Sequence, residues 1–118
     1  MKKLIIILAL PLTSLGQTKD SVYKYLVQIG VKHPKIVLKQ AILETGHFKS
    51  YSCRVRKNLF GITIKGKLIT CDSWQESCRK YISTVQYKYK GGDYHNFLFE
   101  LPYATDPDYI KKLNNITI

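Results

Sequence analysis

Apolar residues recur at helical spacing in two segments near the start of the chain. In the first segment they share one face, and Gly30 follows them as a stop signal. These residues are Val22, Tyr25, Leu26 and Ile29. Asp20 or Ser21 is expected to cap this helix. A second helix is expected to begin at His33-Pro34, because proline suits a first turn, and to end at Thr45-Gly46.

The pattern then changes to β-rich residues. Segments 59–64 and 68–71 flank Lys65-Gly66-Lys67, which predicts a β-hairpin. A third helix follows, with Asp72 or Ser73 as its cap and Glu76 completing a capping box. Its apolar face consists of Trp74, Cys78, Tyr81, Ile82 and Val85, and Gly91-Gly92 breaks the pattern.

Two shorter helices are expected in the last quarter of the chain. One covers residues 93–101, and the other starts at Asp106-Pro107, with the aspartate as cap and the proline in the first turn. The pattern as a whole predicts a mostly helical α+β domain with one small β-hairpin.

The first sixteen residues have the order of a secretory signal peptide. Lys2 and Lys3 precede an apolar run, 4–12, that is too short to span a bilayer, and Ser14 and Gly16 suit cleavage before Gln17. We therefore expect residues 1–16 to be a signal peptide and residues 17–118 to form one domain. The expected location is secreted or periplasmic.

Charge narrows the class of partner. The formal net charge is +11, and it falls to +9 without Lys2 and Lys3. A surface this basic favours an anionic partner such as nucleic acid, anionic lipid or the carboxylates of a cell wall. Export argues against nucleic acid, and helices that are core-forming rather than lysine-striped argue against membrane activity. We expect a monomer with no stable membrane insertion after signal cleavage.

Cys53, Cys71 and Cys78 are expected to serve structure rather than catalysis. In an oxidising compartment, three cysteines predict one disulfide and one free thiol, and the sequence leaves the pairing open. Their spacing matches no zinc site, so neither a metal nor another cofactor is expected.

Glu44 is the most informative single residue. It is the only carboxylate of its helix and lies near the helix C-terminus, where the macrodipole disfavours a negative charge. Partial burial would raise its pKa further. A carboxylic acid that stays protonated near neutral pH is what a glycosidase needs to protonate a leaving oxygen. A solvated or salt-bridged glutamate is the alternative.

Four blocks of sequence resemble the glucosaminidase family of glycoside hydrolases, family seventy-three, which includes bacterial autolysins and flagellar rod-cap hydrolases. They occur in family order and are QAILETGHFKS (40–50), NLFGI (58–62), DSWQES (72–77) and YATDPDY (103–109). The resemblance implies a lysozyme-like fold and an endo-β-N-acetylglucosaminidase that acts on the glycan strands of peptidoglycan. Glu44 falls on the general acid of the family.

The resemblance also implies roles for other residues. Tyr103 falls on a tyrosine near the reacting sugar, so Glu44 and Tyr103 are the expected catalytic pair. Asn58, Phe60, Gly61 and Tyr109 are the expected substrate-binding residues. Asn58 could instead cap a turn and Tyr103 could be a surface tyrosine.

One feature departs from the two-carboxylate pattern of glycosidases. No Asp or Glu lies between Thr45 and Cys71, the region that contains the hairpin. We expect the 2-acetamido group of the substrate to act as nucleophile. Alternatively, Asp72, Glu100 or Asp106 could act as a base.

Two other functions compete with this one. A lytic transglycosylase also uses a single glutamate on a lysozyme-like fold. A non-catalytic module that binds the cell wall would explain the basic surface and the missing second acid.

Overall fold

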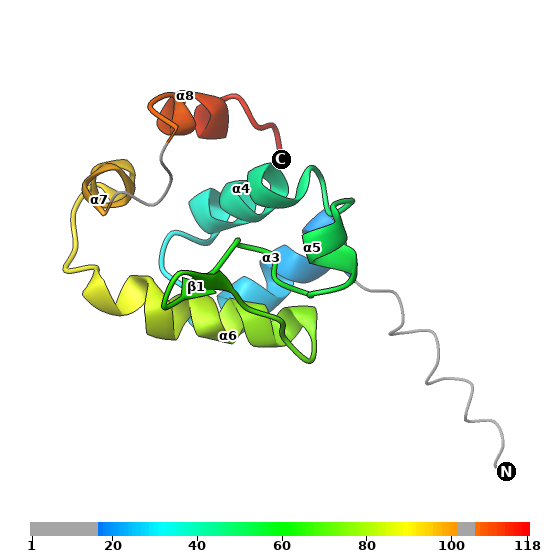
Figure 1. Cartoon of the computed structure of the whole chain (residues 1–118). Helices are drawn as coiled ribbons and strands as arrows, with labels where there is room; N and C mark the ends of the chain where they lie inside the picture. The colour runs from blue at the N-terminus through cyan, green and yellow to red at the C-terminus, as the bar shows by residue number, and fades with distance from the viewer. Residues whose placement is uncertain (1–16, 102–105) are drawn as a thin grey trace, which may run out of the picture.

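A computed structural model describes residues 17–101 and 106–118. Figure 1 shows α4 in the middle of the molecule, with α8 on one side and α6 on the other. The elements in chain order are α3 (Lys19–Gln28), α4 (Pro34–Thr45), α5 (Tyr51–Arg54), β1 (Thr63–Ile64), β2 (Lys67–Leu68), α6 (Trp74–Thr84), the 3-10 helix η1 (Gln86–Lys88), α7 (Tyr94–Glu100) and α8 (Tyr109–Asn114).

The first helix begins earlier than expected. Thr18, rather than Asp20 or Ser21, is the N-cap of α3, because the Thr18 hydroxyl accepts from the Ser21 backbone N–H at 3.1 Å and the Ser21 hydroxyl accepts from the Thr18 N–H at 2.8 Å. This reciprocal pair satisfies two backbone donors that the helix itself leaves free.

The bounds of α4 confirm those predicted from sequence. Pro34 is its first residue, and Gly46 ends it in the left-handed conformation at φ 57°. His33, which precedes Pro34, is also left-handed, with φ 54°. Glu44 is therefore the penultimate residue of this helix.

The predicted hairpin forms with shorter strands. Thr63 pairs with Leu68 and Ile64 with Lys67 in an antiparallel ladder. Lys65 and Gly66 connect the strands, and both have positive φ, as a type I′ turn requires. Beyond the ladder only an isolated bond from the Ile69 N–H to the Ile62 carbonyl continues the pairing, at 3.1 Å.

The later helices differ from the prediction at their ends. Ser73 caps α6 as expected, but Glu76 accepts from the Asp72 N–H rather than from the Ser73 N–H. The sequence did not predict α5. The last helix begins at Tyr109, because the Asp106 carboxylate holds the Asp108 N–H at 2.9 Å and so forms a turn before the helix.

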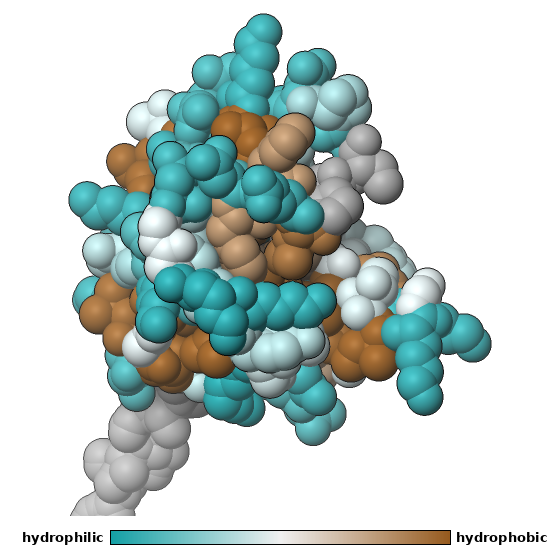
Figure 2. Space-filling view, turned by 90° about the vertical axis from the view of Figure 1, so that its left-hand side faces the viewer, coloured by the Kyte–Doolittle hydropathy of each residue, from teal (hydrophilic) through white to brown (hydrophobic). Residues whose placement is uncertain are grey.

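One hydrophobic core is formed by buried side chains of α3, α4, α6, α7, α8 and the 58–62 loop, and within it α4 packs against α3 and α8. The mostly helical α+β class is confirmed. Figure 2 views the side that carries α7 and shows apolar patches among many hydrophilic side chains. Within residues 17–101 and 106–118, no helix has the length and apolar character that crossing a membrane requires.

Candidate active site

Glu44 is half-buried at the end of α4. The local sequence fixes this end in two ways. The Thr45 hydroxyl donates to the Ala41 carbonyl at 2.7 Å and accepts from the Phe48 N–H at 2.7 Å. Gly46 then takes the left-handed conformation that stops the helix. Glu44 is thereby held in the last turn of a rigid element.

The environment of Glu44 raises the pKa of its carboxyl group. Burial is the largest cause, and a side-chain hydrogen bond from Tyr109 acts in the opposite direction. The direction agrees with the sequence-based expectation, and burial is the cause that raises the pKa. The carboxyl group therefore keeps its proton to a higher pH than an exposed glutamate would.

Gly61 lies directly against the acid. A Cβ atom at this position would be 3.0 Å from the Glu44 Oε1 atom, and the φ of Gly61 is 64°. A larger residue would therefore push against the carboxylate and would also strain the backbone. This close approach explains why glycine follows Phe60 in the NLFGI block.

Asn58 and Phe60 are buried, with 1% and 0% of their surfaces exposed. The Asn58 amide donates to the Ile62 and Ile69 carbonyls at 2.9 and 3.2 Å and accepts from the Ile62 N–H at 3.0 Å. In this conformation neither side chain is open to a ligand. Their observed role is to hold the loop that carries Gly61 against Glu44.

Tyr109 is also buried, and its hydroxyl faces Glu44 from α8. Its oxygen accepts from the Gln40 amide at 3.2 Å. Burial raises the pKa of Tyr109, so that it stays a neutral donor toward the carboxylate. The structure thus places Tyr109 as a support for the acid from inside the protein.

A polar hollow of about 160 Å³ adjoins the acid through Gly61. Two threonines contribute to it, Thr63 of β1 and Thr84 at the end of α6. It is lined by Gly61, Ile62, Thr63, Thr84, Val85 and Leu101. A hollow lined by two threonines beside a half-buried carboxyl group suits a polar ligand.

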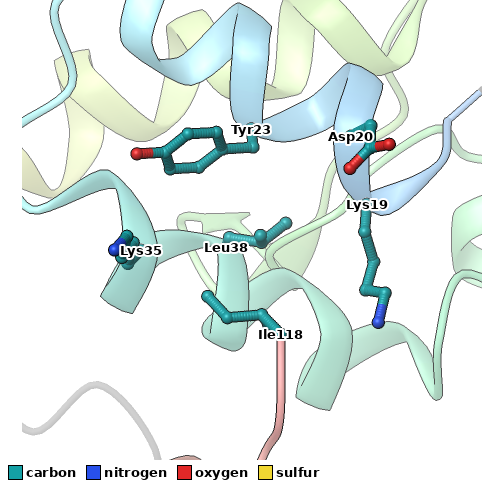
Figure 3. A pocket seen from close by; sticks show the side chains of 6 residues that line it. All are labelled: Lys19, Asp20, Tyr23, Lys35, Leu38 and Ile118. Carbon is teal, nitrogen blue, oxygen red and sulfur yellow. The ribbon is translucent and has the colours of Figure 1, made fainter.

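Figure 3 shows a larger cavity, of about 340 Å³, and Glu44 is not among the residues that line it. It is formed by Lys19, Asp20, Tyr23, Lys35, Leu38 and Ile118. None of the residues predicted to be functional borders it, so we do not place the chemistry there.

None of the carboxylates expected as alternative second groups contributes to the shift in the Glu44 pKa. Asp72 and Glu100 are exposed. Asp106 binds Lys112 at 2.5 Å, and this hydrogen bond lowers the pKa of Asp106. Tyr103, the second predicted catalytic residue, lies outside the described residues. No group of metal-binding side chains occurs among those that the structure describes.

The predicted disulfide is absent from the structure. All three cysteines are free and buried, and burial raises the pKa of each thiol, that of Cys78 to about 12. Cys53 accepts a hydrogen bond from the Gln17 side chain at 3.1 Å. The thiols behave as small apolar core groups rather than as a covalent link.

Sequence reasoning missed the buried polar residues behind Glu44. Gln40 is 0% exposed and lies one helical turn before Glu44. A glutamine on the face that an otherwise apolar helix buries was the available signal. It indicated a hydrogen-bonded partner across the core.

Comparison with known families agrees with this geometry. The chain matches the glucosaminidase family, described as mannosyl-glycoprotein endo-beta-N-acetylglucosaminidase, over residues 19–117. No match was found among curated proteins or among solved structures. The half-buried acid, the loop against it and the buried tyrosine all fall within the matched span, and the chain belongs to the glucosaminidase family.

Proposed function

We propose that the protein is a secreted or periplasmic endo-β-N-acetylglucosaminidase that cleaves the glycan strands of peptidoglycan, with Glu44 as its general acid. The observation that carries this proposal is the half-buried Glu44, whose burial raises its pKa beside a polar hollow. Membership of a family of glycoside hydrolases supports the reaction class.

The first step requires a proton on the leaving oxygen. Glu44 donates its proton to the glycosidic oxygen as the bond to C1 of N-acetylglucosamine breaks. The carbonyl oxygen of the 2-acetamido group forms a bond to the same carbon, and the positive charge is held in the resulting ring. The ionised Glu44 then takes a proton from water, which attacks C1 and reopens the ring.

Substrate assistance is proposed because no Asp or Glu lies between Thr45 and Cys71 and no carboxylate of the described residues contributes to the shift in the Glu44 pKa. Glycosidases usually pair two catalytic carboxylates, but here Asp72 and Glu100 are exposed and Asp106 is engaged by Lys112. From the family resemblance alone, we assign Tyr103 to positioning the acetamido group.

The basic surface supports an anionic polymer as substrate. The chain has 19 lysines and arginines against 8 acidic residues. The carboxylates of peptidoglycan stem peptides are a suitable counter-charge for an exported protein.

The test compares wild-type protein with Glu44→Gln on purified sacculi and analyses the released fragments by mass spectrometry. New reducing N-acetylglucosamine ends from wild type, absent with Glu44→Gln, are expected. Glu100→Gln is the matched control, since Glu100 is an exposed glutamate near the end of α7. Loss of activity in that variant would assign the second carboxylate to Glu100 and remove substrate assistance.

Other products would identify the competing functions. Anhydro-muramyl ends would show a lytic transglycosylase. Binding to sacculi without any released fragment would show a wall-binding module. De-N-acetylated glycan should resist cleavage, and its cleavage at the normal rate would exclude the acetamido group as nucleophile.

A further inference from the structure

A chain of buried side-chain hydrogen bonds ends at Glu44. It crosses the core and joins η1, α7, α6, α4 and α8. We call it the donor relay, and its members in order are Gln86, Tyr94, Tyr81, Gln40 and Tyr109, all of them buried. Buried polar groups require partners, and here the partners form one continuous line.

The far end of the relay is fixed by backbone. The Gln86 side-chain oxygen accepts from the Lys32 N–H at 3.0 Å, and its nitrogen donates to the Lys32 carbonyl. These two contacts leave the Gln86 amide a single orientation. If the amide were reversed, its NH₂ group would face the Lys32 N–H and its oxygen would face the Lys32 carbonyl, so neither hydrogen bond could form. The second N–H of this amide donates to the Tyr94 hydroxyl at 2.9 Å.

This anchor determines the direction of the next bonds. Tyr81 gives its single hydroxyl proton to the Gln40 side-chain oxygen. Tyr94 must therefore be the donor in the 2.8 Å contact between the Tyr94 and Tyr81 hydroxyls. Each group in the line gives a proton in the same direction, toward Glu44.

The near end of the relay determines which group receives the hydroxyl proton of Tyr109. With its oxygen held by Tyr81, the Gln40 amide directs its nitrogen at Tyr109. The Tyr109 oxygen accepts that bond, and its own proton goes to the Glu44 carboxylate. A proton on the Glu44 oxygen that faces Tyr109 would compete for the place that the Tyr109 proton occupies.

We propose that the donor relay positions the acid proton of Glu44. The relay commits the Tyr109 proton to one carboxylate oxygen and so leaves the acid proton on the other oxygen. Gln40, Tyr81 and Tyr94 are then positioning residues, which act on the acid through Tyr109. This proposal rests on Glu44 being the general acid of the proposed function.

The role of Tyr81 follows from the freedom of an amide to rotate. Without the proton that Tyr81 donates, the Gln40 amide could turn its oxygen toward Tyr109. Tyr109 would then give its proton to Gln40, and Glu44 would lose a hydrogen bond that stabilises its ionised form. A change three hydrogen bonds away along the relay would in this way reach the Glu44 carboxyl group.

Few other groups can act on the titration of Glu44. The 58–62 loop faces it with Gly61, which has no ionisable side chain. From α8 the facing group is Tyr109, and no charged side chain of the described residues contributes to the shift in its pKa. A change in the relay should therefore appear as a change in the titration of Glu44.

The experiment follows the Glu44 carboxyl carbon by NMR across pH in protein labelled at glutamate. Tyr109→Phe and Tyr81→Phe are both expected to move the midpoint of this titration upward by about one pH unit, the size of a single hydrogen bond to a carboxylate. Tyr25→Phe is the matched control, because the Tyr25 hydroxyl meets Arg79 outside the relay. It should leave the midpoint unchanged.

The pH profile of cleavage provides a second readout. In Tyr81→Phe the loss of activity at high pH should move upward with the NMR midpoint. If the Tyr81→Phe variant is folded and its Glu44 titration is unchanged, the proposed role of the relay is wrong, even if the melting temperature of the variant falls. If Tyr81→Phe unfolds, Tyr109→Phe tests the bond that ends the relay, and an unchanged Glu44 titration in that folded variant would also overturn the proposal. Wild-type protein that cleaves no sacculi, but whose Glu44 responds to Tyr81→Phe, would overturn the proposed function and leave the relay in place.

Discussion

Glu44 at the end of α4 and Asp106 just before α8 carry the same functional group in opposite environments. Burial raises the pKa of Glu44, and its polar contact is a neutral tyrosine. Asp106 is solvated and binds Lys112, which lowers the pKa of Asp106. The first arrangement suits a proton donor near neutral pH, and the second keeps a carboxylate ionised. The environment therefore gives these two carboxyl groups pKa shifts of opposite sign.

The largest expected effect contrasts the two carboxylates in activity. Glu44→Gln should lower the rate of glycan cleavage about a hundredfold to ten-thousandfold, the range that a general acid contributes. Asp106→Asn should keep most of the activity, because Asp106 is tied to Lys112. Release of fragments from sacculi measures both. Equal losses of activity in the two variants would show that Glu44 and Asp106 do not differ in their importance for cleavage.

A second prediction tests the packing against Glu44. Gly61→Ala should lower activity about a hundredfold, since displacement of a catalytic group by a fraction of an ångström to one ångström has effects of this order. Gly66→Ala is the control, because Gly66 also has positive φ but no atom lies within 4 Å of the added Cβ.

Both glycine variants carry backbone strain, about 1–2 kcal/mol for a left-handed non-glycine residue. A similar fall in thermal stability is thus expected for the two, with the loss of cleavage confined to Gly61→Ala. If Gly66→Ala lost as much activity, the contact with Glu44 would not be the cause.

A third prediction concerns stability against pH. The folded protein binds the Glu44 proton more tightly than the unfolded chain does, so stability falls as pH rises through the raised pKa of Glu44. Glu44→Gln removes this dependence and should be more stable than wild type at neutral pH. Below pH 4.5, the ordinary value, the advantage should vanish. Thermal melts across pH test this, and a difference independent of pH would contradict it.

The smallest effect is expected at Asp106, with the opposite sign. Its lowered pKa means that it stabilises the folded state above its ordinary value of 3.8, and that this contribution is lost as pH falls through the lowered pKa. Asp106→Asn should thus reduce the melting temperature slightly at neutral pH and not at all in strong acid. Exposure keeps the effect small. A large loss at neutral pH would show a structural role beyond the ion pair.

Local signals predicted several elements and failed at particular ends. Pro34 and Gly46 mark the bounds of α4 because their backbone preferences act within a few residues. The start of α8 was misplaced because Asp106 and Pro107 resemble a helix cap, whereas the Asp106 carboxylate forms a turn with Asp108. Local residue preferences do not distinguish a helix cap from a turn of this kind.

The site divides in the same way. The sequence alone pointed to Glu44, since a lone carboxylate at the end of an apolar helix and the family blocks are both properties of the chain. Glu44 as catalytic acid, Tyr103 as its partner, the substrate-binding residues and the signal peptide all remain predictions.

Only the tertiary structure decided what surrounds the acid. The burial of Asn58 and Phe60, the free thiols and the contact of Gly61 with Glu44 depend on segments that meet after folding. The relay from Lys32 to Glu44 joins five helical elements, and its direction depends on how each amide and hydroxyl faces the next. Sequence determined which group could be the acid because that depends on residue type and helix position. The position of the Glu44 proton depends on partners that are distant in the sequence, and only the folded structure brings these partners together.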